Sequence, residues 1–345
     1  MRPPIGNKYV HTLLVDGNAV LKTAYHGAKN LYHNENHIGG LFQFMSLIRK
    51  VINENRFDKI YVFWDGPFSG RLRYDIYKEY KQNRDKDFYN VKETSEPEFL
   101  IQKERVKSYL EELYIRQYED DIVEADDCIG YYCKNIEDNE KIVIMSNDRD
   151  LCQLIGDRVG LYMLNRRTII SKNNYSEYFD HHYSNSKLIK IICGDSSDNI
   201  KGIKGIKEKT LIKYFPELSE KNLTITDIFD KIKQIQNERK KPLKTLDNIL
   251  NGVTDGSQKN DFFDINEKII NLAAPLVTEE CEENLKTIFE SPLDPEDRGT
   301  KNILKMMIDD GFIFAIPGGR DGYLEYLRPF LRIIKKEKEF FNTNN

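Results

Sequence analysis

The first 65 residues contain two short apolar runs that each end in an aspartate followed by a glycine. His11–Asp16 reads HTLLVD and Lys59–Asp65 reads KIYVFWD. Compact apolar runs that stop at a glycine predict buried strands. Between them, Ile38–Asn53 carries apolar residues at helical spacing, over a length sufficient for a crossover between parallel neighbours. The pattern therefore predicts an α/β sheet whose first two strands end in acids.

The alternation of strands and helices continues for about a hundred residues more. Tyr114–Tyr118 and Lys141–Ser146 are predicted as the third and fourth strands. Leu161–Asn165 and Thr168–Ser171 are predicted as a terminal hairpin around two arginines. From about Ser186 the strand pattern ends and short helical segments with lysine-rich turns follow. We therefore expect an α/β domain to be followed by a helical one.

The chain length of 345 residues is consistent with two domains. We place them at residues 1–185 and 186–345. Residues 234–261 are polar, charged or glycine-bearing, so we expect loops or a mobile insertion there.

The overall charge limits how this chain can meet a polyanion. With 52 basic and 56 acidic residues the net charge is −4, so nucleic-acid contacts must come from local basic patches. The five cysteines form no C-x-x-C pair and no secretory apolar region is recognisable, which indicates a reducing cytosol. No apolar stretch approaches the roughly 20 residues that cross a bilayer. We expect a cytoplasmic protein without a membrane span.

Acidic residues end or follow all four main strands. The carboxyl ends of parallel strands share one edge of a sheet, where ligands bind, so these acids should converge. An isolated acid at such a position is often only a helix cap. Recurrence at four consecutive strand ends favours a site. The acids concerned, with a later pair at helical spacing, are Asp16, Asp65, Glu124, Asp126, Asp127, Asp148, Asp150, Asp195 and Asp198.

Convergent carboxylates need cations. Two unit charges 4 Å apart repel by roughly 4 kcal/mol at an effective dielectric constant of 20. Ligand sets made of oxygen alone select hard ions such as Mg²⁺ or Mn²⁺. Two such ions about 4 Å apart can activate water and neutralise the leaving oxygen of a phosphodiester. The acids therefore predict metal-assisted phosphodiester hydrolysis.

Six motifs occur in the order found in a known family of nucleases. The chain resembles the phage and bacterial 5′→3′ exonuclease and flap endonuclease family, including the 5′-nuclease domain of DNA polymerase I, over roughly Leu13–Phe215. Ser291–Phe312 is more loosely similar to the tail of the phage ribonuclease H branch, whose members strip RNA primers. The motifs are VDGNA (15–19), FWDG (63–66), EYKQNR (79–84), EADD (124–127), SNDRD (146–150) and GDSSDNIKGIKGIKEKT (194–210).

The resemblance implies a mostly parallel central sheet flanked by helices, of the PIN and 5′-nuclease type. It also implies a helical arch at about 70–105 and, in the C-terminal helical domain, a helix–three-turn–helix hairpin at about 194–215. By the same resemblance Asp148 would lie between two Mg²⁺ ions, for which Mn²⁺ can substitute. The first ion would be held by Asp16, Asp65, Glu124, Asp126 and Asp127, and the second by Asp150, Asp195 and Asp198.

The run Arg71–Lys86 has six basic and three acidic residues. Alone, such a run would be read as a solvated helix. The resemblance places it in the arch, where Tyr80 would stack a base and Lys81 and Arg84 would contact the scissile phosphate. Asp85–Glu98 is polar and charged, and we expect it to order on substrate. Further DNA contacts are expected from Arg71, Arg73 and Lys78.

The hairpin would bind duplex DNA through glycines that permit close approach and through a helix N-terminus. This sequence departs from the family pattern, with Lys204 where proline is common and Lys207 where a third glycine is common. A lysine there would be strained at positive φ, which bears on the potassium ion that family hairpins often hold through carbonyls. The expected DNA-binding residues are Gly202, Lys204, Gly205, Lys207, Lys209 and Thr210.

The sequence thus predicts a divalent-metal-dependent 5′-nuclease that acts on DNA with 5′ flaps, nicks or RNA primers. Its activities would be 5′→3′ exonuclease, flap endonuclease and ribonuclease H. We expect a monomer, and the family suggests single-strand DNA-binding protein as a partner. Two alternatives stay open: a catalytically silent junction-binding module of the same fold, and a PIN-type ribonuclease, which should lack the lysine-rich hairpin.

Overall fold

The computed structural model describes residues 9–84, 88, 97–239, 241–255, 258, 260–295 and 298–344. The segment Asp85–Glu98, which we expected to order on substrate, lies outside these residues except for Phe88, Pro97 and Glu98. In the described part, no helix is long and apolar enough to cross a membrane.

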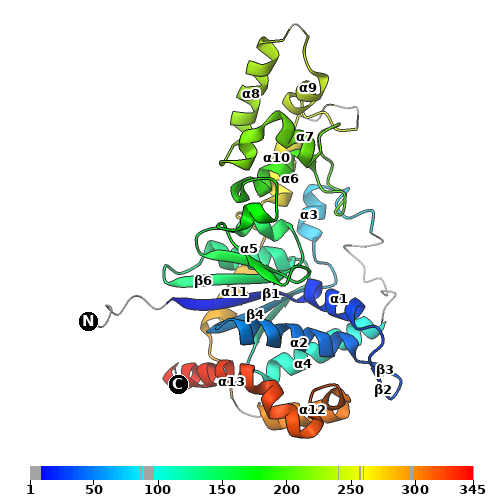
Figure 1. The fold of residues 1–345 in the computed structure, drawn as a ribbon, viewed down its shortest axis with the longest axis vertical. Coiled ribbons are helices and arrows are strands. Elements are labelled where there is room, and N and C mark those ends of the chain that lie inside the picture. The colour runs from blue at the N-terminus through cyan, green and yellow to red at the C-terminus, as the bar shows by residue number, and fades with distance from the viewer. Residues whose placement is uncertain are drawn as a thin grey trace, which may run out of the picture.

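A six-stranded sheet with the order β5-β4-β1-β6-β7-β8 forms the centre of the molecule (Figure 1). Neighbouring strands are parallel except β8, which is antiparallel to β7. The four predicted main strands and the terminal hairpin are confirmed. The strands are β1 (Val10–Asp16), β4 (Lys59–Asp65), β5 (Arg116–Asp120), β6 (Glu140–Ser146), β7 (Val159–Met163) and β8 (Thr168–Ile170), beside a small separate pair, β2 (Tyr32–His33) and β3 (Asn36–His37).

Both faces of the sheet are buried, which explains why its central strands carry continuous apolar runs such as Leu13–Val15 and Ile60–Trp64. Along β1, Leu13 and Val15 belong to one hydrophobic core and Leu14 to the other. The first core lies against α1 (Gly17–Gly27), α2 (Gly39–Glu54), α4 (Pro97–Glu112), α12 (Thr300–Asp309) and α13 (Gly319–Asn344). The second lies against α5 (Ala125–Lys134) and α11 (Glu279–Glu290).

A group of helices with its own core stands above the sheet (Figure 1). The predicted change from strands to helices near Ser186 is confirmed. The helices of this group are α6 (Ser186–Cys193), α7 (Glu208–Tyr214), α8 (Ile225–Asn237), α9 (Lys244–Leu250) and α10 (Phe262–Ile270). The remaining elements are α3 (Arg71–Ile76) and the short 3-10 helices Asp150–Leu154, Tyr175–Glu177, Tyr183–Asn185, Pro216–Ser219 and Phe312–Phe314.

The prediction of loops over residues 234–261 is wrong in part. Residues 234–237 complete α8, and residues 244–250 form α9. Leu246 and Ile249 of α9 are fully buried in the core of the helical group. Two apolar residues three apart are enough to anchor a helix of two turns when a core is already present, because tertiary packing supplies most helical stability.

The chain returns to the sheet after α10. Arg116 of β5 is buried and donates from Nε and Nη2 to the carboxylate of Glu337 in α13, at 3.2 and 2.7 Å. Its Nη1 donates to the carbonyl of Ser291 at 2.6 Å. These contacts fasten the C-terminal helix beside the edge strand. The division into domains at residues 185 and 186 stays a prediction from the sequence.

Replacing Arg116 with glutamine should lower the free energy of unfolding by about 3–5 kcal/mol, because Glu337 would be left as an unpaired buried charge. Urea denaturation measures the change. The control is Lys335→Gln, which removes an exposed ion pair with Glu339 and should cost about 0.5 kcal/mol or less. Equal losses in the two variants would contradict this assignment.

Candidate active site

Acids at the ends of three neighbouring strands meet at one edge of the sheet. Asp16, at the end of β1, caps α1 by accepting from the amide of Ala19 at 3.0 Å. It also accepts from Ser146 Oγ of β6 at 2.7 Å. Asp65, at the end of β4, accepts from the amide of Ala125 at the start of α5 at 2.9 Å. Each acid therefore holds its neighbouring element in place as well as facing the site.

Ser146 connects this group to Asp148. Its Oγ accepts from the amide of Asp148 at 3.0 Å, while its hydroxyl hydrogen goes to Asp16. Asp148 Oδ1 in turn accepts from the amide of Asp150 at 2.8 Å. The loop after β6 is thus folded by its own acids.

The carboxylates at this edge destabilise one another's charge. Burial and the charges of Asp65 and Asp148 raise the pKa of Asp16 to about 7. Burial, followed by the charges of Asp148 and Asp16, raises the pKa of Asp126 well above its usual range. Burial also raises the pKa of Asp148, against the opposing effects of two lysines. This is the electrostatic signature of a site that gains stability from added positive charge.

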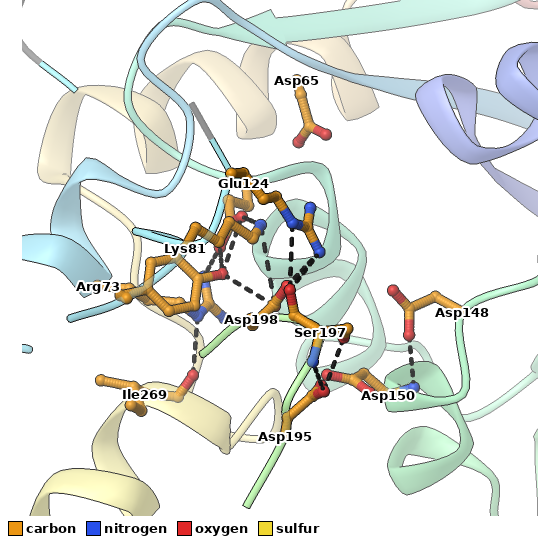
Figure 2. Close-up of polar contacts among 12 residues, drawn as sticks. Asp65, Arg73, Lys81, Glu124, Asp148, Asp150, Asp195, Ser197, Asp198 and Ile269 are labelled. Carbon is orange, nitrogen blue, oxygen red and sulfur yellow. Dashed lines mark hydrogen bonds and ion pairs between the residues drawn. The ribbon is translucent and has the colours of Figure 1, made fainter. Parts of the chain in front are cut away.

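A second group of acids lies next to the first. One oxygen each from Asp150, Asp195 and Asp198 lies within 4.8 Å of the others. Figure 2 shows Asp148 beside this group. Burial raises the pKa of Asp195, but Lys190 and the hydrogen bonds from Ser197 outweigh it and lower the pKa to about 2.

The loop that carries Asp195 and Asp198 depends on two glycines. Gly194 ends α6 with φ of 70°, a left-handed conformation that favours glycine. At Gly202 a Cβ atom would overlap the carbonyl of Cys193. The loop can therefore fold back on the end of α6, closed by paired backbone hydrogen bonds between Asp195 and Ile200.

Lysine side chains enter the acidic cluster from two sides. Lys190 of α6 contacts Asp150 and lies 2.8 Å from Asp195. Lys81 contacts Glu124 and lies 3.9 Å from Asp198 (Figure 2). We did not predict Lys190, although a single lysine within the apolar stretch LIKIIC is an available signal, since a helix of that composition is buried.

Arg73, which we predicted to contact DNA, is buried among acids. Its guanidinium is buried and donates to Glu124 at 2.6 Å, to Asp127 Oδ1 at 3.0 Å and to the carbonyl of Ile269 in α10 at 2.8 Å. In this structure Arg73 is therefore a buried partner of acids and a carbonyl, and its role as a DNA contact stays a prediction. The amide of Leu276 also donates to Asp127 at 2.9 Å. Asp127 is thus engaged with Arg73 and Leu276 in this structure, and its role as a metal ligand stays a prediction.

Tyr80 is also buried, with 2% of its surface exposed. Its hydroxyl donates to Glu124 at 2.9 Å and its ring stacks near Phe88. The ring is therefore not accessible to a base in this conformation, and base stacking by Tyr80 stays a prediction. Arg84 remains accessible, with half of its side chain exposed, and it contacts Asp198 and donates to the carbonyl of Ser197 at 3.2 Å.

The other residues predicted to bind DNA lie at the surface or in tight turns. Arg71 and Lys78 are partly exposed and both pair with Asp75. In the hairpin, Lys207 has φ of −119°, so the strain considered for a lysine at this position does not arise. Exposed lysines follow one another along the turn and the start of α7. The hairpin residues are Gly202, Lys204, Gly205, Lys207, Lys209 and Thr210.

A hollow of about 500 Å³ joins the acids to the hairpin. Asp148, Asp150 and Asp195 line it together with Lys207 of the hairpin. A strand that follows this hollow would pass from the hairpin to the carboxylates.

The fold and the acidic edge define a nuclease of the 5′-nuclease fold class. The 5′-exonuclease of bacteriophage T5 with divalent metal ions (zinc) bound has the same fold, with a TM-score of 0.63 at 20% sequence identity over 81% of this chain and 98% of that one. The T5 D15 flap endonuclease in a complex with DNA and metal ions matches with a TM-score of 0.60 at 20% identity over the same shares.

The sequence comparisons define the family more closely. Residues 11–183 match the model of the 5′-3′ exonuclease N-terminal resolvase-like domain. A 5′-3′ exonuclease of Mycoplasmopsis pulmonis is 31% identical over 229 residues, which are 63% of this chain and 73% of that protein. DNA polymerase I of Bacillus subtilis is 30% identical over 208 residues, 58% of this chain and 22% of the polymerase. The chain belongs to the 5′-3′ exonuclease family, and the predicted enzyme class, a phosphodiesterase, is confirmed.

Removal of the Arg73 guanidinium should destabilise the fold. In Arg73→Gln the buried carboxylates of Glu124 and Asp127 lose their partner, so we expect a loss of about 3–5 kcal/mol in the free energy of unfolding. Chemical denaturation provides the measurement. Arg71→Gln, two residues away in the same helix and partly exposed, should cost at most about 0.5 kcal/mol. A surface role for Arg73 would instead give similar small changes in both.

The raised pKa of Asp16 predicts how stability depends on pH in the presence of EDTA. The folded protein holds a proton up to about pH 7 that the unfolded chain releases near pH 4, so this stabilising contribution is lost as the pH rises between those values. Asp16→Asn keeps the cap and cannot ionise. Relative to wild type, it should gain on the order of 2 kcal/mol between pH 5 and pH 8. Exposed Asp180→Asn should show no such trend.

Proposed function

We propose that this protein is a Mg²⁺-dependent 5′-nuclease that hydrolyses phosphodiesters in DNA with 5′ flaps, nicks or RNA primers. The observation that carries the proposal is the convergence of acids from separate strands and loops, with oxygens of Asp150, Asp195 and Asp198 within 4.8 Å of one another. Asp16, Asp126 and Asp148 lie beside them with raised pKa values. Holding these carboxylates together costs free energy because their negative charges repel one another, and bound cations would offset this cost.

The donor set fits hard divalent cations. Only oxygen ligands are offered, which suits Mg²⁺, with Mn²⁺ as a substitute. One ion would be held by acids of the group Asp16, Asp65, Asp126 and Asp148, and the other by Asp150, Asp195 and Asp198. A pair of divalent cations supplies activation of water and charge neutralisation at the leaving oxygen.

We do not extend the proposal to potassium. Family hairpins hold that ion through backbone carbonyls. Here the carbonyl of Ile203 accepts from the amide of Ile206, and that of Lys204 accepts from the side chain of Asn248.

The cationic side chains have a separate role in this proposal. Burial lowers the pKa of Lys81, but the charges of Glu124, Tyr80 and Asp198 outweigh it and raise the pKa well above its usual value. Lys81 therefore stays protonated and acts as a fixed positive charge toward the phosphate, not as a base. Arg84, which is half exposed, can present its guanidinium to the same phosphate.

The proposed substrates follow from the hollow and the relatives. The hollow leads from the exposed lysines of the hairpin to the acids, as a strand entering from a duplex would require. The T5 flap endonuclease is described with DNA and metal ions, and we propose a flapped or nicked DNA substrate here as well. Primer removal, a monomeric state, a cytoplasmic location and a single-strand DNA-binding partner belong to the same proposal.

The test is cleavage of a labelled 5′-flap oligonucleotide with Mg²⁺. Asp148→Asn should lose at least about 100-fold in single-turnover rate, and Lys81→Ala about 100-fold, since removing one group that stabilises transition-state charge costs 10²–10³. Lys172→Ala, an exposed residue paired with Asp157, is the control and should retain the wild-type rate. EDTA should abolish cleavage.

Two results would contradict this proposal. Wild-type rates in both variants would remove the mechanism. Tight junction binding by wild type with no cleavage in Mg²⁺ or Mn²⁺ would identify a silent DNA-binding module. Parallel assays on nicked DNA, an RNA-primed duplex and single-stranded RNA rank the activities. Cleavage restricted to the single-stranded RNA would indicate the PIN-type alternative.

A further inference from the structure

Two arginines beside the acids are each held over an aromatic ring. The guanidinium carbon of Arg149 lies 5.0 Å from the ring centre of Phe179, and that of Arg166 lies 5.1 Å from the ring centre of Tyr178. The two rings are neighbours in the sequence. A cation over an aromatic face is held in position while its outward N–H groups stay free. The pair is therefore partly ordered before any ligand arrives.

The turn between β7 and β8 is fixed to the acidic edge. It carries Arg166 and Arg167, and the amide of Asn165 donates to the side chain of Asn147 at 2.9 Å. Asn147 directly precedes Asp148. Because β7 runs parallel to β6, this turn emerges at the same edge of the sheet as the carboxylates.

The charges of these arginines are largely available. In the described part of the chain, Arg166 and Arg167 form no ion pair with a carboxylate, and both are exposed. Arg149 lies 3.6 Å from Glu208, and 58% of the Arg149 side chain is exposed. Glu208 is also hydrogen bonded to His181.

We propose that Arg149, Arg166 and Arg167 form a phosphate-binding strip that holds the backbone of the substrate strand next to the carboxylates. Arg149 lines the hollow that joins Asp148 to Lys207, so the strip continues a path already present. This inference rests on the proposed nuclease function.

The chemistry of the site favours a nucleic-acid backbone as its ligand. The chain carries a net charge of −4 and its acids repel phosphates, so cations at the rim of the site are needed to bring a strand close. Guanidinium groups bind phosphate with two parallel hydrogen bonds, and phosphate contacts fix the position of a strand without reading its sequence. The strip should therefore contribute to affinity and leave sequence preference unchanged.

The test variant is Arg166→Gln combined with Arg167→Gly. Arg167 has φ of 51°, a backbone conformation that glycine adopts readily, so the turn should remain folded. The control is Arg158→Gln, which removes one positive charge just before the opposite end of β7, where Arg158 lies 3.8 Å from Asp138. Circular dichroism melting should give both variants transitions close to that of wild type.

Binding is measured by fluorescence anisotropy with labelled 5′-flap DNA in Ca²⁺, across 50–200 mM salt. We expect the double variant to raise Kd about 10-fold and to reduce the slope of log Kd against log salt by about 1–2, since each phosphate contact contributes about 0.9. Arg158→Gln should match wild type. At saturating enzyme with Mg²⁺, the single-turnover rate of the double variant should stay within about threefold of wild type, because the strip acts on binding.

A Kd and salt slope equal to those of Arg158→Gln, in a double variant that melts normally, would overturn the strip. If the double variant does not fold, binding by Arg166→Lys decides between the two outcomes: a retained salt slope with weakened binding supports the strip, and unchanged binding overturns it. Both results are distinct from failure of the proposed function, which would appear as absence of cleavage by wild-type enzyme.

Discussion

Repulsion between carboxylates governs how this protein is built. The parallel sheet brings the ends of β1, β4 and β6 to one edge, where β1 and β4 end in Asp16 and Asp65 and the loop after β6 adds Asp148. The loop after α6 adds Asp195 and Asp198. Burial, together with the neighbouring negative charges, raises the pKa values of Asp16 and Asp126, and Lys81 and Lys190 lie against the cluster. The fold tolerates the cluster because cations are built into it.

The acids form two groups, according to whether an arginine of the protein neutralises their charge. Glu124 and Asp127 are bound by Arg73, and Arg73 also holds the carbonyl of Ile269 in α10, so this trio ties the nuclease core to the helical group. Asp16 and Asp148 receive hydrogen bonds, but their pKa values remain raised. Their negative charges are therefore not fully compensated by positive groups of the protein. Within EADD, Glu124 and Asp127 are bound by Arg73, whereas Asp126 has a raised pKa.

The sheet could be predicted from the sequence because its strands are local signals. Lys59–Asp65 contains the continuous apolar run Ile60–Trp64 and is followed by a glycine, and the structure gives the same bounds. Burial of charged residues could not be predicted, because it is set by distant partners. Arg73 meets a carbonyl 196 residues further along the chain, and nothing in the basic run around it indicates this. The burial of Tyr80 could not be predicted for the same reason. Helix α9 was not predicted because its two core residues, Leu246 and Ile249, lie in a charged stretch.

The base of the predicted arch and the second group of acids are parts of one assembly. The amide of Lys81 donates to the carbonyl of Asp198 at 2.8 Å, and its ammonium reaches Glu124 from the same backbone position, where φ is 52°. Asn83 and Arg84 donate to carbonyls of the loop between Asp195 and Asp198. Any change in the charge balance at Asp198 therefore acts directly on the segment that carries Lys81. The same segment buries Tyr80. Exposing the Tyr80 ring to a base therefore requires the contacts of Lys81, Asn83 and Arg84 with the Asp195–Asp198 loop to break together. The position of the base of the predicted arch is thus coupled to the charge of these acids.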